Sequence, residues 1–192
     1  VHAIRYCLKE AGLRLCDLDA VAVPWKYWEI GTRARLAVSA MVRSPQLFRE
    51  KGRRSIERLR QEWWELACLR RKLSAQIDGT PCPPVTFLDH HMCHAASAFL
   101  VSPFERAAVL VVDGASESHS TMMAVADRQQ IHAIGRTPLP HSLGQFYAAM
   151  TAFLGFKPDH DEYIVMGLAA YGEPRYAETI RRYILRLVPD GT

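Results

Sequence analysis

The apolar residues of the chain recur at two kinds of spacing, one typical of helices and the other of strands. Residues 2–12 have the pattern of an amphipathic helix that ends at Gly12, and a short apolar strand follows at 21–23. Between residues 46 and 77 apolar side chains again recur at helical spacing: Ile56, Leu59, Trp63, Leu66, Leu69 and Leu73. We therefore expect this part to be mainly helical, with Gly52 placed to divide its longest helix in two.

The rest of the chain mixes strand and helix signals. After a proline-rich connector at 80–84, the apolar run at 107–112 is typical of a central strand that is buried on both faces. Residues 121–126 and 130–134 resemble an antiparallel pair that turns at 127–128. A further strand is expected at 85–88, and helices at 90–100, 142–154, 165–170 and 176–187. Strands interleaved with helices predict an α/β layered domain.

The composition fits one globular domain. With 192 residues, 49% of them hydrophobic, the chain is long enough to bury a real core. It holds no uninterrupted apolar run of about 18 residues, and its start reads as a helix rather than a signal peptide, so we expect no membrane association. Its five cysteines are scattered and form no CxxC pair, which argues against disulfides and against a zinc knuckle. These features predict a cytoplasmic protein.

Much of the excess positive charge, +4 in total, lies in the segment 49–72. A nucleic-acid surface would be basic in this way. Here, however, Glu57, Glu62 and Glu65 alternate with arginines at spacings that allow ion pairs along a helix. We interpret the segment as a solvated helix face and expect no nucleic-acid partner.

The densest group of metal-binding side chains lies between Leu88 and Phe99, where three of the chain's eight histidines fall within five residues. In a helix that begins here, His90 and His94 lie one turn apart on one face, the spacing with which two imidazoles bind one metal ion. His91 and His94, three residues apart, could pair as well, and the spacing does not choose between the two pairs. The alternative is a group of exposed histidines at a helix start, without a metal.

Asp113 and Gly114 follow the apolar run that we predict to be a strand. Open α/β sheets form their sites at the carboxyl ends of strands. A carboxylate there completes a set of two histidines and one carboxylate, which suits iron(II) or a similar divalent metal. Gly114 allows close approach of the backbone to a ligand. The alternative is an aspartate that only shapes the turn after a strand.

Two further segments carry weaker signals. Ser142 is placed to cap a helix, and a helix start with Gly144 nearby favours a phosphate or another anion. Most serines at such positions only cap the helix. The stretch 161–172 is rich in small residues, which indicates tight packing beside a ligand or another element.

Five motifs across about residues 85–174 resemble, in order and spacing, the carbamoyltransferases of nodulation and antibiotic biosynthesis. They are His90-His91-x-x-His94-Ala-Ala-Ser-Ala-Phe, Asp113-Gly114, Ser142-Leu-Gly-x-Phe-Tyr, Leu154-Gly-Phe and Glu162-Tyr-x-Val-Met-Gly-Leu-Ala-Ala-Tyr-Gly. A weaker likeness extends upstream through Ile4-x-Tyr-Cys-Leu and Asp17-Leu-Asp19. Five ordered motifs are hard to obtain by chance, so the chain is identified as a member of this family.

The resemblance implies that residues 1–192 are part of an actin-like, ribonuclease-H-like domain, with a mixed sheet flanked by helices. In the family a C-terminal domain, absent from this chain, makes carbamoyl adenylate from carbamoyl phosphate and ATP. The actin-like domain then passes the carbamoyl group to a hydroxyl of a small-molecule acceptor. By motif position, His90, His94 and Asp113 would bind a divalent metal, with Fe²⁺ the first choice.

The resemblance also suggests roles for neighbouring residues. His91 would hydrogen-bond the substrate, assist proton transfer, or hold a metal ligand in place without binding the metal itself. Gly114, Ser142 and Gly144 would line the phosphate or carbamoyl site.

The chain departs from the family pattern at several points. It lacks the opening glycine-rich strand pair with its His-Asp segment, Ile164 replaces a common lysine, and Ser116-Glu117 stands for the usual Gly-Glu. We therefore expect the 192 residues alone to be catalytically inactive, even if they bind metal. The alternatives are a related carbamoyl or threonylcarbamoyl transferase of tRNA modification or hydrogenase maturation, and a degenerate metal-binding domain. A homodimer is a further possibility for its assembly.

Overall fold

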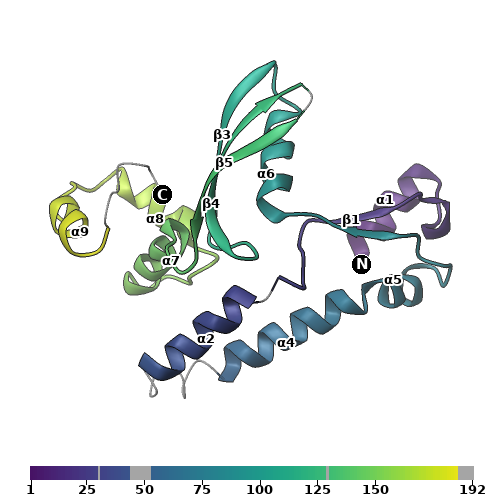
Figure 1. Cartoon of the computed structure of the whole chain (residues 1–192), viewed down its shortest axis with the longest axis horizontal. Helices are drawn as coiled ribbons and strands as arrows, with labels where there is room; N and C mark the ends of the chain where they lie inside the picture. Colours follow the sequence, from purple (N-terminus) through teal and green to yellow (C-terminus); the bar gives the residue numbers. More distant parts are fainter. Residues whose placement is uncertain (30, 44–52, 129, 186–192) are drawn as a thin grey trace. The chain divides into compact units, whose positions relative to one another are not determined.

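The computed structural model describes residues 1–29, 31–43, 53–128 and 130–185. The chain divides into two compact units, Val1–Cys93 and His94–Thr192, and each contains its own small sheet (Figure 1). The boundary falls inside one continuous helix, α6 (His90–Phe99). The first turn of α6 therefore belongs to one unit and the remainder to the other.

The first unit pairs two short parallel strands and is otherwise mainly helical. β1 (Val21–Val23) and β2 (Val85–Phe87) lie in register, with Val23 opposite Phe87. α1 ends at Gly12 as expected, because this glycine has a φ of 68° and its N–H bonds the last carbonyls of the helix. The helical segments are α1 (His2–Ala11), the 3₁₀ turn η1 (Leu15–Asp17), α2 (Gly31–Arg43), α4 (Arg53–Ala67) and α5 (Leu69–Ile77).

The core of this unit is held by apolar packing and by one aspartate. Buried together are Leu8, Leu15, Leu73 and Cys82. The Asp78 carboxylate accepts hydrogen bonds from the Leu15 N–H at 3.0 Å and from the Thr80 N–H and hydroxyl at 2.9 and 2.6 Å. These hydrogen bonds, the one from the Thr80 hydroxyl first, stabilise the charged carboxylate and lower the pKa of Asp78.

The second unit is built on an antiparallel sheet in which β4 is the middle strand. Its strands, in order, are β3 (Arg106–Val112), β4 (His119–Asp127) and β5 (Ile131–Pro138). Met122, Ala124 and Ala126 alternate along β4 and are buried, so one face of the sheet forms a core. Three helices follow: α7 (Leu143–Phe153), α8 (Glu162–Ala169), which contacts α7, and α9 (Ala177–Tyr183).

Most expected elements are confirmed, but the helical part of the first unit differs in two ways. α2 is a helix that the apolar pattern did not predict. The long helical stretch also divides at Cys68, between α4 and α5, although helix-type hydrogen bonds from Cys68 to Trp64 and from Lys72 to Cys68 bridge the division. Gly52 and residues 186–187 lie outside the described residues.

The prediction for residues 107–112 is wrong in one respect. The run does form β3, but within the described sheet β3 is an edge strand that pairs with β4 alone. Alternate side chains face outward, so Leu110 is 66% exposed and Val112 is 50% exposed, whereas Val111 is buried. An unbroken apolar run indicates a strand but carries no information about how many neighbours that strand has.

Parallel and antiparallel pairing both occur, but the described residues divide them between two sheets. The architecture is therefore mixed α/β, and the actin-like assignment stays a prediction. Among the helices of the described segments, none combines the length and the apolar character that crossing a membrane requires.

Candidate metal centre

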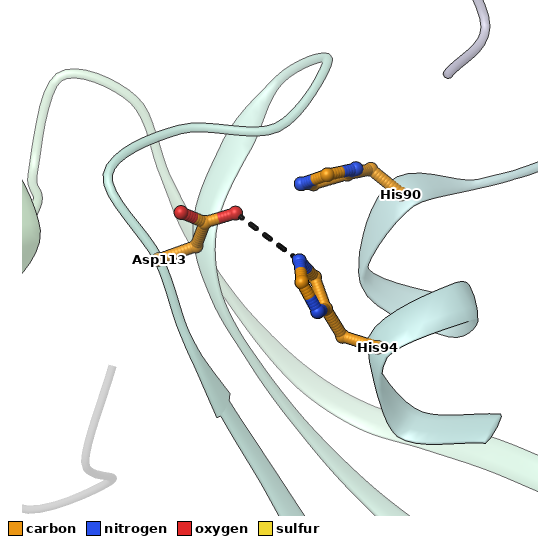
Figure 2. Close-up of side chains that lie close together, drawn as sticks. All are labelled: His90, His94 and Asp113. Carbon is orange, nitrogen blue, oxygen red and sulfur yellow. Dashed lines mark ion pairs between the residues drawn. The ribbon is translucent and has the colours of Figure 1, made fainter. Parts of the chain in front are cut away.

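Helix α6 presents two histidines on one side. It begins at His90 because the Asp89 carboxylate accepts a hydrogen bond from the Met92 N–H at 2.9 Å, which caps the helix start. His90 and His94 lie four residues apart on this helix, and both point toward the same carboxylate (Figure 2). Because one helix carries both residues, their spacing follows from helix geometry alone.

Asp113 directly follows β3, and the hydrogen bonds of the turn orient its side chain. Its N–H donates to the carbonyl of Ser120 in β4 at 2.9 Å, and its Oδ1 accepts from the Gly114 N–H at 2.6 Å. The other carboxylate oxygen, Oδ2, lies 3.7 Å from Nε2 of His94 (Figure 2). The end of β3 therefore presents one carboxylate oxygen to the histidine.

The three side chains form a donor set that fits a divalent metal ion. One ligand atom from each of His90, His94 and Asp113 lies within 4.8 Å of the others. The 3.7 Å between His94 and Asp113 is too long for a direct hydrogen bond but shorter than two metal–ligand bonds of about 2.1 Å placed end to end. The His94 and Asp113 side chains are 52% and 30% exposed, so solvent and ions reach them. Two imidazoles and one carboxylate with open positions suit iron(II).

His91 lies apart from this group. Its side chain is completely buried, and it is not one of the three clustered ligands. Its ring centroid is 6.0 Å from that of His90. Of the two histidine pairs that the sequence allows, the structure therefore brings His90 and His94, rather than His91 and His94, to Asp113.

The start of α7 packs directly against the Asp113–Gly114 turn. The Ser142 Oγ caps the helix by accepting from the Gln145 N–H at 3.0 Å, and the same hydroxyl donates to the Gly114 carbonyl at 2.8 Å. A Cβ on Gly144 would lie 2.8 Å from the Gly114 N and Cα and from the Asp113 carbonyl oxygen, so the turn leaves no room for a side chain there. Gly114, Ser142 and Gly144, which the resemblance assigns to a phosphate or carbamoyl site, thus lie together beside Asp113.

The loop after this turn is also packed. Ser116 and Glu117, which stand where the resemblance expects Gly-Glu, are both buried. The Ser116 hydroxyl donates to the His119 carbonyl at 2.8 Å, which closes the turn between β3 and β4. The Ser116 N–H donates to the same carbonyl at 2.7 Å, so the hydroxyl adds a second hydrogen bond to a turn that the backbone also closes.

Sequence reasoning missed two residues beside His90. The Pro24 carbonyl and the Trp25 ring both contact the His90 imidazole. β1 and β2 are parallel, so the residues that follow these strands meet at one edge of the sheet. The sequence predicts both strands but does not show that they pair with each other, so it does not reveal these two contacts.

Known proteins match the chain over its whole length. The family model described as Carbamoyltransferase N-terminus matches residues 1–192. An uncharacterized protein of Synechocystis sp. is 36% identical over 198 residues, which cover 100% of this chain and 31% of that protein. Nodulation protein NolNO of Sinorhizobium fredii is 33% identical over 192 residues, which cover 99% of this chain and 26% of that protein.

A third relative matches part of the chain. Nodulation protein NolO of Bradyrhizobium diazoefficiens is 41% identical over 105 residues, which cover 54% of this chain and 19% of that protein. The chain thus spans less than a third of the length of these relatives. Because the family model covers every residue, the chain belongs to the carbamoyltransferase N-terminal family.

Proposed function

We propose that this chain is the metal-binding part of an O-carbamoyltransferase, an enzyme that moves a carbamoyl group onto a hydroxyl of a small-molecule acceptor. One observation carries the proposal: His90, His94 and Asp113 converge in a chain that matches the family over all its residues. The matched parts cover less than a third of these relatives, so the activity of a complete enzyme is itself part of the proposal.

His90, His94 and Asp113 would hold the ion, with Fe²⁺ the first candidate. When bound, a divalent metal neutralises phosphate charge and orients the carbamoyl donor. The donor that we propose is carbamoyl adenylate, formed from carbamoyl phosphate and ATP. The Asp113 carboxylate would contribute a negative charge to the donor set, and the two imidazoles would bind the ion as neutral ligands.

In the transfer step, the acceptor oxygen forms a bond to the carbamoyl carbon. The bond from that carbon to the phosphate oxygen breaks, and AMP leaves with the electron pair. The hydroxyl proton passes to a base or to water. Holding acceptor and donor side by side removes much of the entropic barrier to this step.

The surroundings of the site support two finer assignments. The amino end of α7 lies against the Asp113–Gly114 turn, and helix amino ends favour anions, so Gly114, Ser142 and Gly144 would border the donor's phosphate. His91 is completely buried, which supports a role in holding the metal ligands in place rather than in direct proton transfer from the acceptor.

Metal content is the first test. The chain would be purified without oxygen and its metals measured by mass spectrometry, beside His94→Ala and the control His132→Ala, which removes an exposed histidine of β5. We expect close to one divalent ion per chain in the wild type and in His132→Ala, and almost none in His94→Ala. A wild type without metal, or equal metal in His94→Ala, would contradict the proposed ligands.

The donor is tested separately. A stable sulfamoyl analogue of carbamoyl adenylate would be titrated into the metal-loaded chain by calorimetry. Binding that disappears in His94→Ala or after chelation supports the assignment. Absence of binding to the metal-loaded wild type would contradict the proposed donor while leaving the metal site in place.

A further inference from the structure

The His90 imidazole has a defined hydrogen-bond partner outside the ligand group. Its Nδ1 lies 2.9 Å from the backbone carbonyl oxygen of Pro24, the residue directly after β1. Both residues belong to the unit Val1–Cys93. A carbonyl oxygen only accepts hydrogen bonds, so Nδ1 must carry the hydrogen. In the neutral ring this leaves the lone pair on Nε2, the nitrogen that points toward Asp113 (Figure 2).

An aromatic contact fixes the plane of the same ring. Trp25 meets His90 edge to face, with centroids 4.9 Å apart and ring planes at 66°. The Arg33 guanidinium in turn lies over the Trp25 ring, 4.8 Å from its centroid. The His90 ring is therefore held at one nitrogen by Pro24 and along its side by Trp25, whose own position Arg33 supports.

Strand pairing explains why these residues meet. β1 and β2 run parallel with Val23 opposite Phe87, and the Leu88 N–H donates to the Val23 carbonyl at 2.8 Å. Both strands therefore end at the same edge, where one continues into Pro24 and Trp25 and the other into His90.

We infer that Trp25, together with the Pro24 carbonyl, is a positioning element for His90 as a metal ligand. The inference rests on the proposed metal site and extends it to residues that contact no metal themselves. A ring that is already held in the ligating tautomer and orientation loses less freedom when it binds an ion. Partners of this kind typically change metal affinity by about 10- to 100-fold when they are removed.

The test compares two nearby tryptophans that have different ring contacts. Trp25 contacts His90, whereas Trp28 contacts Tyr27 and Phe87 and is 53% exposed. Co²⁺ would be titrated into the wild type, Trp25→Ala, Trp25→Phe and Trp28→Ala, with the visible absorption of the bound ion as readout and circular dichroism as a check of folding. We expect about tenfold weaker binding and an altered spectrum in Trp25→Ala, recovery in Trp25→Phe, and wild-type behaviour in Trp28→Ala.

A second readout needs no metal. Nitrogen-15 NMR of the metal-free chain reports which ring nitrogen of neutral His90 carries the hydrogen. We expect Nδ1–H in the wild type and a mixture of the two tautomers in Trp25→Ala. A wild type with the hydrogen on Nε2 would overturn the inference.

The outcomes separate the inference from the proposed metal site. If Co²⁺ binds the wild type and is lost in His94→Ala but binds Trp25→Ala unchanged, the metal site stands and the positioning role is overturned. Equal weakening in Trp25→Ala and Trp28→Ala would also overturn it, because the effect would then not depend on ring contact with His90. A wild type that does not bind Co²⁺ removes the metal site, and with it the role of Trp25.

Discussion

His90 and Asp113 are held in place by two different kinds of contact. Around His90, in the unit Val1–Cys93, a carbonyl and an aromatic ring surround the imidazole. Around Asp113, in the unit His94–Thr192, backbone atoms approach so closely that Gly144 has no space for a Cβ. Ring contacts can be partly replaced by another aromatic side chain, whereas a methyl group on Gly144 would lie only 2.8 Å from backbone atoms of the turn.

The support around His90 depends on the core of its unit, and the largest stability effect is expected there. Leu15 is 1% exposed, and Leu15→Ala would leave a cavity among the core leucines. We expect the free energy of unfolding to fall by about 2–5 kcal/mol. Urea denaturation measures it, with Leu13→Ala, an exposed neighbour, as control. An equal loss in both variants would show that the core does not dominate this unit.

The support around Asp113 should be sensitive to a single methyl group. Gly144→Ala would displace the Asp113–Gly114 turn, which we expect to cost about 1–3 kcal/mol of stability. Metal affinity should fall at least tenfold, since removing the residues that orient a metal ligand typically has an effect of about that size. The matched control is Gly167→Ala in α8, where an added Cβ meets nothing within 4 Å. Unchanged Co²⁺ affinity in Gly144→Ala would show that the turn does not set the position of Asp113.

The smallest expected effect is the loss of stability in acid that comes from Asp78, which lies in the same unit as His90. The pKa of Asp78 lies below its ordinary value of 3.8, because the Thr80 hydroxyl and then the Leu15 N–H bind the charged form. The charged carboxylate therefore stabilises the fold above pH 3.8, and this contribution is lost as the pH falls through the lowered pKa. Metal-free thermal melting should show a smaller acid dependence in Asp78→Asn than in the wild type. Asp19→Asn, an exposed aspartate of the same unit, is the control and should melt as the wild type does.

The apolar pattern predicted most helices and strands but not how deeply each is buried or which segments lie beside it. It predicts α8, yet Tyr163, Met166 and Leu168 of this apolar helix are all exposed. The pattern also predicts β3 but not its position at the edge of the described sheet. Periodicity reports which backbone conformation a segment prefers, whereas burial depends on which segments pack against it.

The candidate site shows the same division between local and distant causes. The pairing of His90 with His94 was available from the sequence, because helix periodicity alone brings residues four apart to one side. Likewise, the cap at Ser142 and the turn at Gly114 are local features. The position of Asp113 after a predicted strand, and then the order of the motifs, added it to the histidines, although no spacing rule connects residues that lie on different elements.

Tertiary structure decided the remainder. It places His90, rather than the buried His91, in the group of possible ligands with His94 and Asp113. It also brought Pro24 and Trp25 to His90 through the parallel pairing of β1 with β2. Contacts between segments more than 60 positions apart, as from Pro24 to His90, depend on strand register and packing, which no local pattern encodes.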